Sequence, residues 1–190
     1  EYNMLKRGIP IATWHLEETK LRSLLGLVSY EADLNLTRRD LIDDEDATDL
    51  VKETITSLTK DGLLYQFFLQ DGQGVNELCE QIRYFSQACE CKYVFFEPIQ
   101  DLAYSRQTDE SIEKWLSALS VQLSRMSAEL NVGIVTIAHE NDDGQIRDCR
   151  TIGKRASVVV KLQRDKMSSD DEDRNTTRLL VVKNRPAGTT

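Results

Sequence analysis

The chain has 190 residues, of which 40% are hydrophobic and 29% charged, so it can form one globular domain with a full core. Its net charge of −8 argues against a protein that coats nucleic acid or a membrane with its whole surface, although a local basic loop is compatible with it. Apolar runs are far shorter than the ~20 residues of a membrane span, and no signal-peptide pattern opens the sequence, so we predict no membrane association. The four cysteines lack the spacing of a zinc site and are interpreted as reduced thiols in a cytosolic protein.

Predicted strands and helices alternate along the chain. Apolar runs predict strands at Pro10–Glu17, Leu63–Leu69, Lys92–Glu97, Val132–Ala138, Ala156–Leu162 and Arg178–Val182. Apolar residues at helical spacing predict helices at Glu1–Gly8, around Leu21–Val28, and at Asp46–Lys60, Val75–Ala88 and Ser111–Leu130. Polar composition predicts loops at Thr37–Asp49 and Asn141–Gly153, a turn at Asp71–Gly74, and a charged linker at Met167–Thr177.

This order of elements predicts the α/β class. Alternation of strand and helix favours a mostly parallel sheet sandwiched between helices, and the two adjacent strands at the C-terminal end predict a hairpin. No internal repeat or linker divides the sequence, so residues 1–190 are predicted to form one domain.

The stretch Lys92–Asp101 organises the rest of the prediction. Residues Tyr93 to Phe96 are apolar without alternation, which is typical of a strand buried on both faces of a parallel sheet, and Glu97 follows at its carboxyl end. Ligands bind at the carboxyl edge of open α/β sheets, and a carboxylate there suits a hydrated Mg²⁺ beside a phosphate. The alternative is an acid that merely begins a surface turn before Pro98.

Polar residues follow several other predicted strands in the same sense. Glu17, His139 and the group Lys183–Arg185 each come after an apolar run, as Glu97 does. Because the carboxyl ends of parallel strands share one edge of a sheet, we expect these side chains to converge on one site. Two carboxylates, a histidine and a basic pair suit phosphoryl transfer.

Each of these residues has a predicted role. Glu97 would hold Mg²⁺, Glu17 would orient and deprotonate the attacking water, and His139 would sense the γ-phosphate. Lys183 and Arg185 would neutralise developing charge, as an arginine finger does. Taken singly, each residue has a structural alternative. Glu17 could be an acid favoured at a helix N-terminus, His139 a hydrogen-bonded structural histidine, and Arg185 a surface cation.

Four stretches resemble successive motifs of the RecA-like replicative helicases, the DnaB-like and phage primase–helicase group: TWHLEET, YVFFEPIQDL, NVGIVTIAHEND and LLVVKNRPAG. The resemblance implies a RecA-like fold, with Glu17 as the catalytic glutamate, Glu97 as the acid that ends the Walker B strand, and His139 as the phosphate sensor. It implies that Lys183 and Arg185 act in trans on the nucleotide of the neighbouring subunit. The family has Asp where this chain has Glu97, a substitution that keeps the charge but lengthens the side chain.

A basic segment before the last two strands also resembles this family. The sequence QIRDCRTI is similar to the family's Asp-Leu-Arg-Glu-Ser-Gly-Ser-Ile, whose arginine and its neighbours hold single-stranded DNA phosphates in a central channel. The predicted nucleic-acid-binding residues are therefore Arg147, Asp148, Arg150, Lys154 and Arg155, in the densest basic stretch of an acidic chain. Arg150 stands where the family has Gly. The alternative is a solvated loop.

The family's phosphate loop, Gly-x-x-x-x-Gly-Lys-Ser/Thr, does not occur in these 190 residues. Because the later motifs are retained, we interpret the sequence as a fragment of a helicase motor domain, beginning after that loop and inactive without it. The resemblance implies Mg²⁺ and ATP or dTTP as cofactors, and single-stranded DNA as the ligand of a homo-oligomer, a hexameric ring. Primase and polymerase would be further partners, in the cytoplasm of a bacterium or a phage-infected host.

Two other functions remain open on the sequence alone. A RecA-like recombination ATPase would share the fold but lack the Lys-Asn-Arg arrangement near the C-terminal end. A non-catalytic RecA-like scaffold that clamps DNA or a partner is favoured by the missing phosphate loop and by the unusual Glu97.

Overall fold

The computed structural model describes residues 1–33, 35–36, 45–68, 74–105 and 109–188. Its main sheet has four strands in the spatial order β2-β1-β3-β4, and every neighbouring pair is parallel. The strands are β1 (Ile11–His15), β2 (Leu64–Phe68), β3 (Tyr93–Glu97) and β4 (Gly133–Thr136). β3 therefore lies between β1 and β4, with all carboxyl ends at the same edge.

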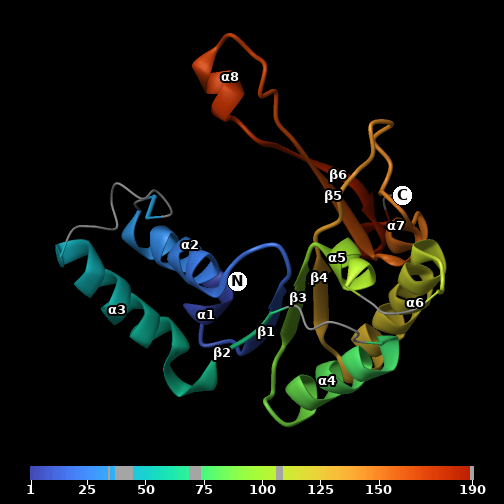
Figure 1. Ribbon diagram of the computed structural model, residues 1–190, viewed down its shortest axis with the longest axis horizontal. Helices are drawn as coiled ribbons and strands as arrows, with labels where there is room; N and C mark the ends of the chain where they lie inside the picture. Colours follow the sequence, from blue (N-terminus) through green and yellow to red (C-terminus); the bar gives the residue numbers. More distant parts are fainter. Residues whose placement is uncertain (34, 37–44, 69–73, 106–108, 189–190) are drawn as a thin grey trace.

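Helices cover both faces of this sheet (Figure 1). One layer contains α1 (Tyr2–Leu5), α2 (Lys20–Ala32) and α3 (Glu45–Thr59), which is followed by a short 3₁₀ turn (Lys60–Gly62). The other contains α4 (Val75–Gln87), α5 (Ile99–Tyr104) and α6 (Ile112–Leu130). The predicted parallel sheet between helix layers is confirmed.

The central strands are apolar because both of their faces are covered. All five residues of β1 are buried, as are the three middle residues of β3. Trp14 of β1 has its ring centroid 4.7 Å from that of Phe67 and 4.9 Å from that of Phe96. Aromatic rings thus fill the core on the α4–α6 face of the sheet, which fixes the positions of the strand ends.

The longest helix, α6, confirms its predicted apolar stripe. Most of the predicted stripe is buried, at Trp115, Leu116, Leu119, Leu123 and Met126. Ser111 caps the helix by accepting a hydrogen bond from the Lys114 backbone N–H, and Asn131 ends it in the left-handed conformation. Two short helices were not predicted, α5 and α7 (Thr151–Arg155), and α7 occupies the end of the predicted polar loop. The buried Ile152 and a 2.9 Å hydrogen bond from Ser117 to Thr151 attach α7 to α6.

The C-terminal strand pair forms a second sheet. β5 (Val158–Gln163) pairs with β6 (Arg178–Asn184) in antiparallel register, which confirms the predicted hairpin, and a 3₁₀ turn (Arg185–Ala187) follows. The pair extends away from the body and carries α8 (Asp171–Asn175) near its tip (Figure 1). Because β6 is not a member of the main sheet in the described part of the chain, the prediction that Lys183–Arg185 end a strand at its edge was wrong.

Two predicted features lie largely outside the described residues, the loop at Thr37–Asp49 and the turn at Asp71–Gly74. Within the described residues, no helix is both long and apolar enough to cross a membrane.

Candidate functional site

The carboxyl edge of the main sheet brings together three of the predicted site residues. The backbone N–H of Leu16, just beyond β1, donates to the carbonyl of Glu97 at 2.9 Å, so Glu17 lies next to the end of β3. On the other side of β3, the chain beyond β4 carries His139, whose Nε2 lies 3.0 Å from Glu17 Oε1. Both side chains are exposed, at 53% for Glu17 and 44% for His139. The predicted convergence holds for these three residues, whereas their roles stay predictions.

A further acid, Asp101 of α5, lies near this pair. Burial raises the pKa of the Asp101 carboxyl, the negative charge of Glu17 raises it further, and His139 lowers it. Asp101 thus shares the electrostatic environment of Glu17 and His139. It lies on a six-residue helix whose length gives no periodic signal in the sequence.

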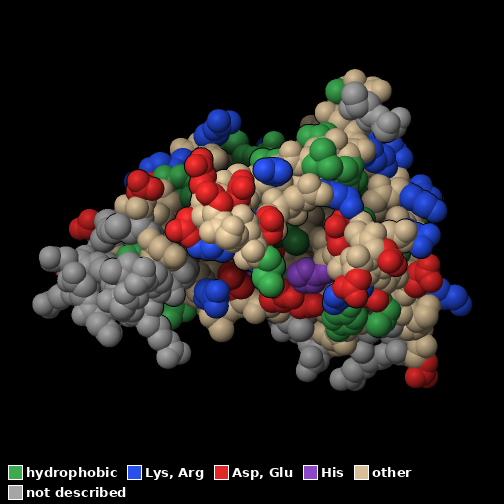
Figure 2. Space-filling model, turned by 90° about the horizontal axis from the view of Figure 1, so that it is seen from above, with side chains coloured by type: hydrophobic (Ala, Val, Ile, Leu, Met, Phe, Trp, Pro, Cys, Tyr) green, Lys and Arg blue, Asp and Glu red, His purple; other side chains and the backbone are tan. Residues whose placement is uncertain are grey.

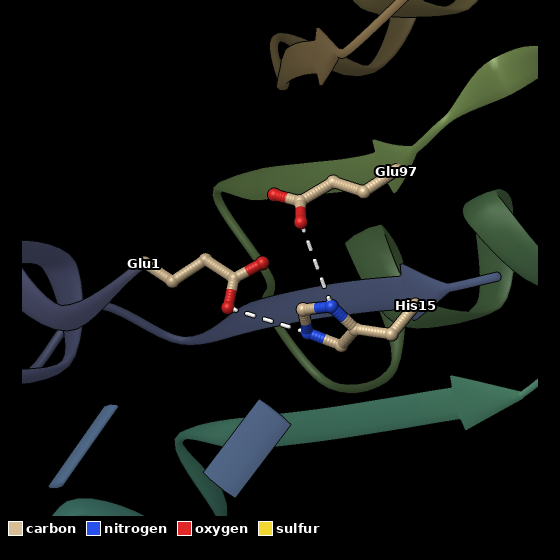
Figure 3. Close-up of side chains that lie close together, drawn as sticks. All are labelled: Glu1, His15 and Glu97. Atoms are coloured by element: carbon tan, nitrogen blue, oxygen red, sulfur yellow. Dashed lines mark ion pairs between the residues drawn. The ribbon is translucent and has the colours of Figure 1, made fainter. Parts of the chain in front are cut away.

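A buried histidine beside Glu97 was missed by sequence reasoning. The imidazole of His15 is 6% exposed and lies between two carboxylates, with Nε2 3.4 Å from Glu1 Oε2 and Nδ1 3.6 Å from Glu97 Oε2 (Figure 3). These are ion pairs, because neither ring nitrogen has a hydrogen-bond partner among the described residues. Burial alone would lower the pKa of His15, but Glu1 and Glu97 together raise it to about 9, so the ring is a cation at neutral pH. The one available signal was a polar residue at the end of an apolar run.

The same cluster supplies the possible metal ligands. Atoms of Glu1, His15 and Glu97 lie within 4.8 Å of one another. Carboxylate oxygens suit Mg²⁺, and the Glu97 side chain is 36% exposed, so solvent and a phosphate can reach it. The protonated imidazole engages one Glu97 oxygen and leaves the other for a hydrated cation.

The segment from His139 to Arg147 folds back on itself. Its ends are joined by a 2.8 Å hydrogen bond from the Arg147 N–H to the His139 carbonyl, and Asn141 N–H donates to Gln145 at 2.8 Å. Lys161 of β5 braces the tip through Glu140 at 2.7 Å and the Gly144 carbonyl at 2.6 Å. We call residues 139–147 the site hairpin. It connects the Glu17 contact directly to the predicted DNA-binding segment.

The predicted DNA-binding cations follow the site hairpin. The exposed residues of this group are Arg147, Asp148, Arg150, Lys154 and Arg155, the last two on α7. Asp148 is held by a hydrogen bond from the Tyr104 hydroxyl. In Figure 2, acidic side chains surround the histidine near the middle of the face, and many lysines and arginines lie along its right-hand edge.

Lys183 and Arg185 lie beside these cations rather than at the sheet edge. Lys183 Nζ donates to the carbonyls of Gly153 and Lys154 at 2.8 and 2.9 Å, and Arg185 donates to the Lys154 carbonyl at 2.8 Å. Burial and the charge of Arg185 lower the pKa of Lys183. The structure therefore separates this pair from Glu17, Glu97 and His139, because β6 belongs to the second sheet.

These features match a known family along almost the whole chain. The model of the DnaB-like helicase C-terminal domain matches residues 2–190. The chain belongs to this DnaB-like helicase family. A comparison with curated protein sequences gave no significant match.

Solved structures show that the DnaB-like fold extends over the described chain. One of them, the ATPase domain of another protein, has a TM-score of 0.72 at 17% identity, with 97% of this chain and 70% of that chain covered. A DnaB-like replicative helicase, studied with its primase interactions, has a TM-score of 0.76 at 17% identity, and the shares covered are 97% and 47%. A KaiC-like protein from the hyperthermophilic archaeon Pyrococcus horikoshii has a TM-score of 0.61 at 15% identity, and the shares are 97% and 69%. The chain thus spans about half of one of these proteins.

Proposed function

We propose that these 190 residues are part of the motor of a replicative DNA helicase, which couples nucleoside triphosphate hydrolysis to translocation on single-stranded DNA. The observation that carries the proposal is the contact of 3.0 Å between His139 and Glu17, at the sheet edge where Glu97 also ends its strand. The site hairpin leads from this contact to the basic segment at Arg147. Membership of the DnaB-like helicase family supports the same function.

The chemistry assigned to each residue follows from its type and place. Glu17 is an exposed carboxylate that can take a proton from an attacking water, and His139 is placed to bind its Oε1 or a phosphate oxygen. Asp101, whose pKa is raised by burial, adds negative charge beside this pair. Excess negative charge at Glu17 favours proton acceptance.

Mg²⁺ fits the residues at the end of β3. Glu97 offers a partly exposed carboxylate, and Glu1 Oε1 is buried with no hydrogen-bond partner among the described residues. When bound, the ion would neutralise charge on the nucleotide phosphates, ATP or dTTP. His15 holds the Glu97 side chain in place through its ion pair.

We further propose that the helicase is a homo-oligomer, a hexameric ring in which Arg185 and Lys183 act on the nucleotide of the neighbouring subunit. Both lie away from Glu17 in this chain, which agrees with an action in trans. The surrounding strand pair exposes large apolar side chains, among them Leu162 at 66% and Leu179 at 70%. An exposed apolar surface of this kind suits a protein partner. Primase and polymerase are further proposed partners.

The test is the Glu17→Gln substitution in the complete protein that contains this domain. The amide cannot accept the proton, so we expect kcat for nucleotide hydrolysis to fall by ~10²–10⁴-fold. Nucleotide affinity, measured with a fluorescent analogue, should be retained. The control is Glu18→Gln, because Glu18 is the adjacent exposed acid and pairs with Arg22 at 3.4 Å. Equal losses of binding and turnover would assign Glu17 a structural role.

A further inference from the structure

Gln100 of α5 is a fully buried polar side chain next to the site, and no role has been given to it so far. It has 0% exposure. Its Nε2 donates to the His139 carbonyl at 3.2 Å and more weakly to the Arg147 carbonyl at 3.5 Å. Its Oε1 accepts from the His139 N–H at 3.3 Å. One amide therefore holds both ends of the site hairpin.

The chemistry of the side chain matches this task. A carboxamide has two N–H donors and an acceptor, and the three contacts use both donors and the acceptor of Gln100. A buried polar group that loses its partner pays the cost of desolvation, so these bonds hold the hairpin ends together. A movement at Arg147 that stretches its bond to Gln100 therefore also acts on the backbone of His139.

Two more contacts attach α5 to the same segment. The Ile99 N–H donates to the Ile137 carbonyl at 2.9 Å, and the hydroxyl of Tyr104 donates to Asp148. Gln100 and Tyr104 are four residues apart and lie on one side of the helix. α5 thus fixes the site hairpin before, at and beyond its two ends, directly after the strand that carries Glu97.

We propose that Gln100 is a positioning residue through which single-stranded DNA at Arg147 controls the placement of His139 against Glu17. The inference depends on the proposed helicase function. It predicts that the amide of Gln100 is needed for the stimulation of hydrolysis by DNA and not for hydrolysis itself.

The experiment compares the complete wild-type protein with its Gln100→Met variant, which keeps the length of the side chain and removes its hydrogen bonds. Nucleotide hydrolysis is measured with and without oligo(dT). We expect the stimulation of kcat by DNA to fall about fivefold, the equivalent of one buried hydrogen bond. The unstimulated kcat, the KM for nucleotide and the affinity for oligo(dT) should stay near their wild-type values. A purely structural role would lower the stimulated and unstimulated rates together.

Two further variants make the result decisive. Gln81→Met repeats the same chemical change on α4, and it should leave the stimulation unchanged. Tyr104→Phe removes a hydroxyl from a side chain that is 50% exposed, so it folds even if Gln100→Met does not, and it should also weaken the stimulation. Wild-type stimulation in both Gln100→Met and Tyr104→Phe overturns the inference alone. If the wild-type protein shows no nucleotide hydrolysis at all, the proposed function itself fails.

Discussion

At the scale of single residues, the site depends on a cation that the sequence hides. His15 is the last residue of a fully buried strand, and its imidazole lies between Glu1 and Glu97 (Figure 3). Removing a charged group from water is unfavourable, and two carboxylates offset that cost. The protonated ring therefore holds the Glu97 carboxylate and ties α1 to the end of β3.

We predict that this ion pair makes stability depend on pH. The pKa of His15 rises from 6.5 in the unfolded chain to about 9 in the folded protein, so its contribution is complete below pH 6.5 and disappears as the pH rises through 9. The full shift corresponds to at most roughly 3 kcal/mol of unfolding free energy. Urea unfolding, followed by the fluorescence of Trp14, should show this decline between pH 6.5 and 9. The isosteric His15→Gln variant should lose the decline, and an unchanged slope in that variant would contradict the role given to His15.

At the scale of elements, long apolar patterns were predictable and short helices were not. β1, β3 and β4 each continue into a polar residue, so their shared edge followed from the sequence, as did the buried stripe of α6. α5 and α7 have six and five residues, too few for a helical period to show. Gln100 was not predictable because its partners are backbone groups 39 and 47 residues away. The separation of the β5–β6 hairpin from the main sheet depends on tertiary contacts that no local pattern encodes.

The site hairpin and α7 form the element on which the DNA prediction is tested. The side chain of Arg147 is exposed at the end of this hairpin. If it binds one phosphate, Arg147→Ala should weaken single-stranded DNA binding and reduce the slope of log K against log salt by about 0.7–1. Fluorescence anisotropy of labelled oligo(dT) between about 50 and 300 mM salt, a range chosen for the strong salt effect (~10³ or more) seen with several phosphate contacts, measures the slope. Arg125→Ala, on the exposed side of α6, is the charge-matched control. Equal slopes for wild type and Arg147→Ala would place the DNA site elsewhere.

At the scale of the whole molecule, the proposed machinery is divided between two bodies of structure. Glu17, Glu97 and His139 belong to the edge of the main sheet, whereas Lys183 and Arg185 lie at the end of the second sheet, against α7. One chain does not join the two groups, so a nucleotide that contacts both must lie between two copies of the chain. This arrangement requires assembly for activity.

Mixing two inactive variants of the complete protein tests this arrangement. Glu17→Gln removes the base from one side of an interface, and Arg185→Ala removes the finger from the other. In mixed rings, some interfaces combine the wild-type Glu17 of one subunit with the wild-type Arg185 of its neighbour, so part of the hydrolysis should return. An arginine finger in trans is worth ~10³–10⁵ in rate, which makes the recovery easy to detect. Rings that demonstrably mix and yet stay inactive would show that Arg185 does not act across an interface.

The most direct test of the motor function is strand displacement by the complete protein on a forked duplex with a single-stranded tail. We predict that displacement requires nucleotide and Mg²⁺, that single-stranded DNA accelerates hydrolysis, and that Glu17→Gln abolishes both activities while DNA binding persists. A protein that binds single-stranded DNA but neither hydrolyses nucleotide nor displaces the strand would contradict the motor and establish the non-catalytic scaffold instead.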